Sequence, residues 1–300
     1  MLKSVNSKAF SSVCVILSGI LWGIIAIFVD GLKRVGFSSV QCAAIRCIFT
    51  SLLLLIIVLI TNPKSLKVQL KDLLVFVCAG VFGISVFSLC YFKAIHVLGG
   101  ASVPSLLLNT SPIFVLIIAS IFFKEKITLT KIGAIVLAVF GVACVSGVFN
   151  GVGAISVEGV VFGVLSGVGY ALYSVFTKSV AKKYSPLVIN FYAYLFAMFI
   201  VVPVSGIFKD IGLLITPKGA LYGFGLVVLC TAVPSVLYSF GMKNLNVSTV
   251  SVMAMVDPVT ATVIGLAFMG ERIDVFKIVG IVLVLTAITI LNLPQKEKNK

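Results

Sequence analysis

The sequence predicts an all-α polytopic membrane protein with ten transmembrane helices arranged as two inverted five-helix repeats. Three observations predict this fold class: the composition, the number of long apolar runs, and an internal repeat. Hydrophobic residues make up 60% of the 300 residues and charged residues 11%, and the mean hydropathy is +1.24. Soluble domains are about 45–50% apolar and about 25% charged, so the composition excludes a soluble protein.

Ten apolar runs are long enough to cross a bilayer, which takes about 20 residues. Short turns separate them, and no soluble domain intervenes. The first run follows Lys3 and Lys8 as a signal peptide would, but it exceeds a typical signal core of about 7–15 residues and has no cleavage site before Asp30, so we count it as a span. The predicted spans are 10–29, 38–60, 73–93, 100–123, 131–149, 157–177, 186–207, 219–241, 247–269 and 275–293.

The stretch 102–131 recurs at 248–277 with a constant offset of 146 residues. Apolar matches carry little weight in so hydrophobic a chain, whereas polar and helix-breaking residues are scarce and would rarely coincide. The coinciding pairs are Ser102/Ser248, Ser105/Ser251, Pro112/Pro258, Glu125/Glu271 and Lys131/Lys277. The chain is therefore predicted to consist of two related halves.

The two halves also match at their beginnings, where residues 17–30 align with residues 165–178 at an offset of 148. We predict a first repeat over residues 1–150, with spans one to five, and a second repeat over residues 151–300, with spans six to ten. Because five is odd, the second repeat enters the membrane from the opposite side. The repeat is therefore inverted about an axis in the membrane plane.

The net charge of +14 comes from short clusters of Lys and Arg between the spans. There is no basic stripe or aromatic stacking platform, so no nucleic-acid partner is expected. With the N-terminus inside, the predicted inner turns carry 15 Lys and Arg residues against 7 outside. The positive-inside rule then predicts a multi-pass protein of the cell membrane with both termini in the cytoplasm.

Two prolines lie inside predicted spans at repeat-related positions. Pro112 and Pro258 each remove the hydrogen bond to the carbonyl four residues back, at Leu108 and Ala254. A freed carbonyl is tolerated within a membrane where it meets a water-filled cavity or another helix. Their recurrence predicts a central cavity between the halves, and the alternative is a kink packed on protein.

Asp257 is the one carboxylate far from any predicted span end. A central Asp costs about 2.5–3.5 kcal/mol on insertion scales, so it is expected to face the protein interior. Its repeat counterpart is Ser111, so symmetry does not require the charge. Its candidate tasks are binding a substrate amine and cycling a proton, and the alternative is a neutral Asp hydrogen-bonded between helices.

Arg46 lies within the second predicted span, about 12 Å deep at roughly 1.5 Å per residue. Three roles stay open for it: holding a substrate carboxylate, pairing with Asp257, or a structural tie to carbonyls. Other amphipathic residues within spans are candidate walls of the cavity, or else interfacial anchors; Trp22 and Tyr170 correspond at the 148 offset. These candidates are Trp22, Tyr170, Tyr91, Tyr238 and Asn109.

Several of these motifs resemble one known family. The features are an L-x-x-x-P pattern from Leu108 leading to Lys124-Glu125, its looser copy from Met253 to Gly270-Glu271, the pair Trp22-Gly23, and Arg46. They resemble the EamA family of the drug/metabolite transporter superfamily over nearly the whole chain. The resemblance implies a ten-helix secondary transporter, often an exporter of amino acids, metabolites or drugs. Lys124 departs from the glycine that the family often has before this glutamate.

Other function classes lack their parts. The single histidine, His96, leaves His-based triads and H-E-x-x-H sites incomplete; no phosphate-binding loop appears, and no cysteine pair has C-x-x-C spacing. We therefore expect no enzyme, no metal and no cofactor. The prediction is a secondary active transporter that exports small metabolites such as amino acids or drug-like compounds by alternating access. Its partners would be that substrate, the lipid bilayer and, as a candidate coupling ion, the proton. The alternatives are a flippase for a lipid-linked or amphiphilic substrate, and a channel or membrane sensor.

Overall fold

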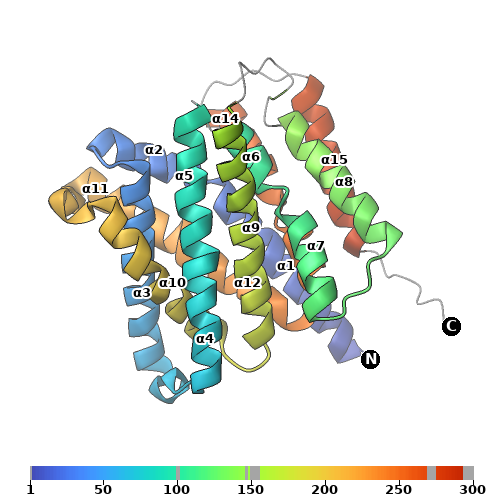
Figure 1. Cartoon of the computed structure of the whole chain (residues 1–300), viewed down its shortest axis with the longest axis horizontal. Coiled ribbons are helices and arrows are strands. Elements are labelled where there is room, and N and C mark those ends of the chain that lie inside the picture. The colour runs from blue at the N-terminus through green and yellow to red at the C-terminus, as the bar shows by residue number, and fades with distance from the viewer. Residues whose placement is uncertain (1, 99–101, 146–147, 149–155, 269–274, 293–300) are drawn as a thin grey trace.

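The computed structural model describes residues 2–98, 102–145, 148, 156–268 and 275–292, and within these ranges the regular elements are helices (Figure 1). Eight helical stretches are long and apolar enough to cross a membrane, and two shorter apolar helices, Leu129–Cys144 and Val275–Leu291, accompany them. The predicted fold class is confirmed. The stretches begin and end within a few residues of the predicted spans, apart from the first, which continues through α2.

Several stretches are divided into consecutive elements. The bounds are α1 (Leu2–Gly23), α2 (Ile25–Val35), α3 (Ser39–Thr61), η1 (Pro63–Leu66), α4 (Leu70–Cys78), η2 (Ala79–Ser85), α5 (Val86–Leu98), α6 (Ser102–Leu108), α7 (Ser111–Phe122), α8 (Leu129–Val145), α9 (Val157–Val180), α10 (Pro186–Ser205), η4 (Ile207–Lys209), η5 (Ile211–Ile215), α11 (Pro217–Phe224), η6 (Gly225–Ala232), α12 (Val233–Asn244), α13 (Val247–Met253), α14 (Val256–Phe268) and α15 (Val275–Asn292).

Local signals explain where corresponding helices begin. Ser38 caps α3 and accepts a hydrogen bond from the Gln41 backbone, and the Gln41 side chain accepts from the Ser38 backbone in return. Ser185 caps α10 by accepting from Val188, with Pro186 in the first turn. The second helix of each half thus starts from a serine cap that occupies the free backbone donors of its first turn.

The third helix of each half contains a π-helical segment, η2 in the first and η6 in the second. The Ser85 hydroxyl donates to the carbonyl of Gly80, and the Thr231 hydroxyl donates to that of Leu226. Each bond reaches five residues back, and the pairs are 146 residues apart. The irregularity therefore recurs at the repeat offset, and such segments are frequent at functional sites.

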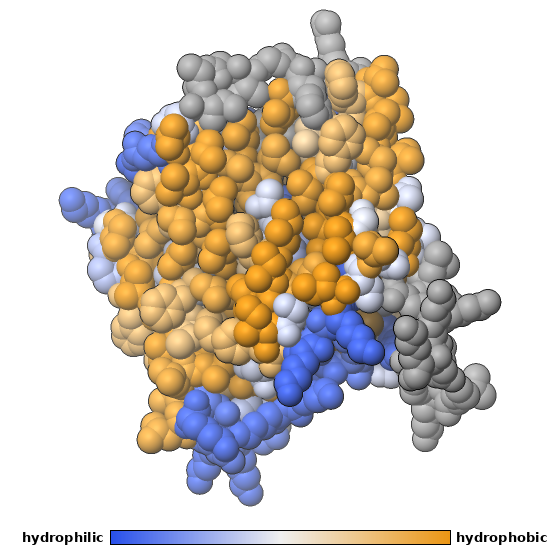
Figure 2. Space-filling view, turned by 45° about the vertical axis from the view of Figure 1, so that its right-hand side comes forward, coloured by the Kyte–Doolittle hydropathy of each residue, from blue (hydrophilic) through white to orange (hydrophobic). Residues whose placement is uncertain are grey.

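The halves interleave across the bundle. Helix α1 packs against α12 and α14 of the second half, and α9 packs against α5, α6 and α7 of the first. Helices α8 and α15 form a separate pair at one edge (Figure 1). We call the end that carries the turns 123–128 and 181–185 the lower side. Figure 2 shows a broad apolar surface with hydrophilic residues gathered near the lower end and at the upper left edge, as expected for a bilayer-spanning bundle.

Candidate functional site

The fourth helix of each half is broken at its middle. In the first half, α6 ends at Leu108 and α7 begins at Ser111. In the second, α13 ends at Met253 and α14 begins at Val256. The prolines therefore accompany short turns between the helix segments, at which backbone hydrogen bonds run from Thr110 to Leu107 and from Met255 to Val252. Paired discontinuous helices are how many transporters form a binding site near the bilayer midplane.

A small cavity lies between the two breaks. Its volume is about 20 Å³, enough for one water-sized group, which needs about 10–15 Å³. Both breaks contribute to its wall, together with one residue of α9. The lining residues are Leu108, Asn109, Ser111, Tyr170, Ser251, Ala254, Met255 and Asp257.

Asp257 lies in the first turn of α14 and lines this cavity. Its Oδ1 atom is buried and has no hydrogen-bond partner among the described residues. A buried polar atom without a partner costs about 1–3 kcal/mol, and more when it is charged. Ser111, its repeat counterpart, lines the same cavity. The cavity therefore has a carboxyl group from one break and a hydroxyl group from the other.

Three aromatic rings adjoin the cavity and contact one another pairwise. The Trp22 ring centroid is 6.2 Å from that of Tyr170 and 5.2 Å from that of Tyr238, and the two tyrosine rings are 6.1 Å apart. Tyr170 is itself a lining residue. Tyr91 adjoins from α5, close enough to Asp257 for an electrostatic interaction. The structure thus brings together four aromatic residues that the sequence selected.

Arg46 lies elsewhere, against η6. Its Nε atom donates to Thr231 Oγ1 at 3.0 Å, and the described residues include no carboxylate in a salt bridge with it. Arg46 is not among the cavity-lining residues. Of the three roles left open by the sequence, this contact is a structural tie, made to a side-chain hydroxyl rather than to a carbonyl.

Glycines let the first helix of each half approach the opposite break closely. A Cβ on Gly19 would lie 2.7 Å from the Ala254 carbonyl oxygen, and one on Gly23 would lie 2.6 Å from that of Asp257. A Cβ on Gly167 of α9 would lie 3.1 Å from the Leu107 oxygen. These contacts are tighter than a larger residue allows, so small residues fix the helix spacing at both breaks.

Three comparisons with known proteins bear on this arrangement. An "Uncharacterized transporter" of Archaeoglobus fulgidus is 27% identical over 94% of this chain and 96% of its own length. "Uncharacterized transporter YxxF" of Bacillus subtilis is 24% identical over 94% of this chain and 89% of its own. One crystal structure shares the fold, with a TM-score of 0.79 at 15% identity over 94% of this chain and 96% of that one.

The model of the EamA-like transporter family matches residues 9–147 and 157–293. The chain belongs to this family. It is a membrane transporter, and its partners include the lipid bilayer and a small-molecule substrate.

In this EamA-like transporter the lysine-glutamate motif ends α7 with a specific turn. Lys124 has a φ of 52°, in the left-handed region, and the Glu125 N–H donates to the Ala119 carbonyl at 3.3 Å. Glycine usually takes such a left-handed position after the end of a helix. The glycine that the family often has before this glutamate is thus explained by geometry, and Lys124 adopts the same turn at a steric cost.

The turn directs Glu125 toward the second half. Its carboxylate accepts hydrogen bonds from the Val247 N–H at 2.9 Å and the Ser248 hydroxyl at 2.7 Å, at the start of α13. Lys131 pairs with the same carboxylate at 2.9 Å, and both side chains are under a tenth exposed. Glu125 therefore ties the broken helix of one half to that of the other. Its repeat counterpart, Glu271, lies outside the described residues.

A second tie joins the halves at the lower side. Asp72 at the start of α4 accepts hydrogen bonds from Lys183 and from the Tyr184 hydroxyl, the latter at 2.6 Å. Lys183 also donates to Gln69 at 2.7 Å. The hydrogen bond to Asp72 raises the pKa of Lys183 above its ordinary value. Two charged contacts, one buried and one exposed, thus connect the halves at this side.

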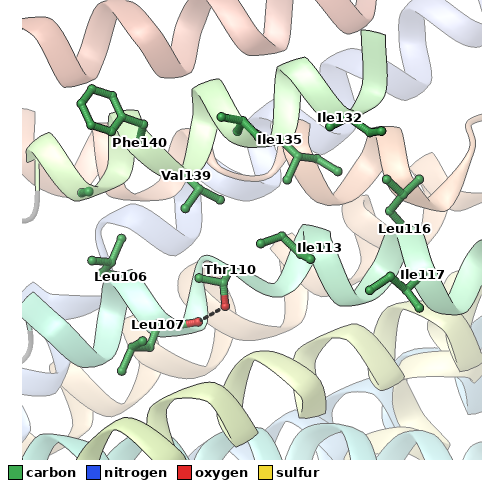
Figure 3. A pocket seen from close by; sticks show the side chains of 12 residues that line it. Leu106, Leu107, Thr110, Ile113, Leu116, Ile117, Ile132, Ile135, Val139 and Phe140 are labelled. Atoms are coloured by element: carbon green, nitrogen blue, oxygen red, sulfur yellow. Dashed lines mark hydrogen bonds between the residues drawn. The ribbon is translucent and has the colours of Figure 1, made fainter. Parts of the chain in front are cut away.

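An apolar groove lies on the other face of the broken helix. Figure 3 shows α8 above α6 and α7, with side chains of both pointing into the space between them. Its volume is about 560 Å³. Thr110 is the one polar lining residue, and its hydroxyl donates to the Leu107 carbonyl at 2.6 Å. The groove is lined by Leu106, Leu107, Thr110, Ile113, Leu116, Ile117, Ile132, Ile135, Val136, Val139, Phe140 and Ala143.

Three of the polar or flexible residues that line the cavity, Ser111, Ser251 and Met255, are not among the candidate site residues predicted from the sequence. The coincidence of Ser105 with Ser251 at the repeat offset is the one signal in the sequence that points to any of them. Single serines are common in helices, so their position beside a break becomes informative only in the folded chain.

Proposed function

We propose that the protein is a secondary active transporter that exports a small metabolite by alternating access and couples this transport to protons at Asp257. One observation carries the proposal: a carboxyl group with an unpartnered buried oxygen faces a cavity between two repeat-related helix breaks. A carboxyl group within a membrane is costly unless it is paired, protonated or hydrated. If Asp257 binds a proton and a substrate in turn, each of them relieves the cost of the buried carboxyl group, and the two binding events are coupled.

The fold supports the motion. The cavity is formed by helices from both halves, so rocking of one half against the other would open it to each side in turn. The proposed halves are residues 1–150 and 151–300. With both termini in the cytoplasm, the lower side and its Glu125 tie would face inward, and the protein would lie in the cell membrane. Fusion of a compartment-sensitive reporter after residue 300 tests this orientation.

The coupling test uses proteoliposomes loaded with a pH-sensitive dye and held with an inward proton gradient. A panel of the common amino acids and aliphatic and aromatic amines is added on the side of the vesicle membrane from which the protein takes up its substrate. For a transported compound, the wild type should dissipate the gradient faster than protein-free vesicles. Asp257→Asn should lose this response, while Asp30→Asn, which alters an exposed carboxylate in an i,i+4 ion pair, should keep it.

An equal gradient response in the wild type and Asp257→Asn would remove Asp257 from coupling. Direction is tested by comparing metabolites in the medium of cells with and without the protein. A compound that accumulates outside only when the protein is present supports export, and one depleted from the medium indicates import.

The apolar groove favours a second candidate, a flippase for an amphiphilic or lipid-linked substrate. Such a protein needs access from the bilayer between helices, and the groove beside α7 opens between α7 and α8 (Figure 3). A dithionite assay with a fluorescent phospholipid measures transbilayer movement directly. A flippase would accelerate it, and Ile113→Trp, which fills the groove, would slow it relative to the exposed control Ile56→Trp. No acceleration alongside gradient-driven transport would exclude this candidate.

A further inference from the structure

The central cavity presents hydrogen-bond acceptors and no cationic side chain. None of its eight lining residues is Lys, Arg or His. The Asn109 amide nitrogen donates to the Ser105 carbonyl, which leaves its own carbonyl oxygen as an acceptor. The Ser251 hydroxyl donates its proton to the Ser248 carbonyl and keeps its lone pairs. With Asp257 Oδ1 unpartnered, the cavity needs donors or positive charge.

The broken backbone adds to this polarity. Pro112 cannot donate to the carbonyl of Leu108, which is a lining residue. Other carbonyls at the two breaks accept backbone hydrogen bonds, that of Leu107 from Thr110 and that of Ala254 from Asp257 among them. When Asp257 is ionised, the site thus has one full negative charge, which a bound cation would balance.

The size and the lining of the cavity limit which kind of cation can bind. A volume of about 20 Å³ accommodates a group of the size of water, such as the –NH₃⁺ of a primary amine, whose three donors match the acceptors present. Tyr170 lines the cavity, and the rings of Trp22 and Tyr238 pack against that of Tyr170. Such rings bind the organic body of a ligand and also attract cations within about 6 Å.

The position of Arg46 argues against a zwitterionic substrate such as an amino acid. An amino acid needs a partner for its carboxylate, yet the guanidinium of Arg46 is held against Thr231 and does not line the cavity. We propose that the cavity binds the primary ammonium group of an organic amine that lacks a carboxylate, with Asp257 as its counter-ion and the Trp22–Tyr170–Tyr238 rings against its body. This inference rests on the proposed function, because it places substrate and coupling proton on one carboxylate in turn.

A consequence is that protonation and amine binding compete. When Asp257 is protonated it loses its charge, so amine affinity should fall as pH falls. Tyr170 and Tyr91 are the titratable side chains that interact electrostatically with Asp257, and tyrosine, with an ordinary pKa of about 10, is neutral at and below neutral pH. Neither of them would account for a loss of binding in the acidic range.

The test uses the single tryptophan of the chain, Trp22, as an intrinsic reporter of binding. Purified protein in lipid nanodiscs is titrated with four probes: phenethylamine, phenylalanine, phenylpropionate and sodium chloride. Phenethylamine should change the Trp22 fluorescence saturably. Phenylalanine and phenylpropionate, which carry the same ring with a carboxylate, should bind at least about tenfold more weakly, a loss of about 1.4 kcal/mol.

Variants then assign the counter-ion. Asp257→Asn should weaken phenethylamine binding about tenfold or more, and Asp30→Asn, which alters a half-exposed carboxylate on α2, should leave it unchanged. The probe comparison uses the wild type alone, so it decides the question even if Asp257→Asn does not fold. Equal binding of phenylalanine and phenethylamine would overturn the proposal. So would a saturable response to sodium alone, which would identify an inorganic cation site.

Transport measurements separate this inference from the carrier proposal. If phenethylamine binds but no panel compound dissipates a proton gradient in proteoliposomes, the site assignment stands and the carrier proposal fails. If other compounds drive proton movement while phenethylamine neither binds nor moves, the carrier stands and the amine assignment fails.

Discussion

Replacing Glu125 should loosen the connection between the two halves at the lower side. The carboxylate accepts two hydrogen bonds at the start of α13, from Val247 and Ser248, at 2.9 and 2.7 Å. It also pairs with Lys131 at 2.9 Å, and the side chains are 7% and 9% exposed, respectively. Because water scarcely reaches these groups, it cannot replace the interactions that the substitution removes.

The expected magnitude follows from that burial. Removing one partner of a buried ion pair typically costs about 3–5 kcal/mol, since it leaves the other charge uncompensated. Glu125→Ala should therefore lower the free energy of unfolding by this amount. Lys131→Met should cost less, about 1–3 kcal/mol, because α13 still donates to the Glu125 carboxylate. The double variant Glu125→Ala/Lys131→Met should be more stable than the sum of the two single effects predicts.

The measurement is SDS-induced unfolding of purified protein in micelles, followed by circular dichroism. The matched control is Glu158→Gln, whose partner Lys93 lies 3.3 Å away with both side chains about half exposed; it should change stability by less than about 1 kcal/mol. A coupling energy between Glu125 and Lys131 below about 0.5 kcal/mol, the scatter expected of independent sites, would refute this reasoning.

Three further substitutions test individual contacts. Lys124→Gly should raise stability by up to about 1 kcal/mol, because it removes a left-handed strain of about 1–2 kcal/mol at the cost of some backbone entropy; a lower unfolding midpoint would contradict the strained left-handed conformation of Lys124. Gly23→Ala should destabilise the protein by about 1–3 kcal/mol through overpacking. Gly133→Ala should not destabilise it, because the space around its Cβ is open. Equal effects of the two substitutions would count against the close approach of Gly23 to α14. At pH values below the ordinary lysine pKa of 10.5, Lys183→Met should lower the stability of the protein. This effect should disappear as the pH rises through the raised folded-state pKa of Lys183, because a neutral lysine no longer favours the folded state over the unfolded one. An effect independent of pH in unfolding titrations would show that the charge of Lys183 is not involved.

The fold was predictable because its signals repeat. A single proline in an apolar run could be a kink packed on protein, but Pro112 and Pro258 at one offset predicted paired irregularities, and the structure shows both. The packing at the two breaks was less accessible, because it involves Gly19 and Gly167, which contact the broken helix of the opposite half. Those contacts join residues far apart in the sequence, and neither residue carries a signal for its partner.

The site was predictable only in part. Asp257 could be selected because a charge within a span is rare, and Trp22 with Tyr170 because they match at the repeat offset. The position of Arg46 could not be predicted, since depth in a span gives neither the direction of a side chain nor its partner. The role of Glu125 was hidden for the same reason: the motif identifies a helix end, but its partners at Val247 and Ser248 belong to the other half.

Because the two helix breaks are related by the repeat, the carboxylate of Asp257 can be moved by mutation to the corresponding position of the other half. Asp257 and Ser111 are repeat counterparts and line one cavity of about 20 Å³, so a carboxylate at either position would face the same ligand group. We expect Asp257→Ser to abolish phenethylamine binding and Asp257→Ser/Ser111→Asp to restore part of it, measured by Trp22 fluorescence. Restored binding together with altered proton coupling would show that a carboxylate at either position can bind the amine. It would also show that the half that carries the carboxylate determines how transport is coupled to protons. If the folded double variant binds no better than Asp257→Ser, the two breaks are not equivalent walls, and the position of Asp257 on α14 matters more than its charge.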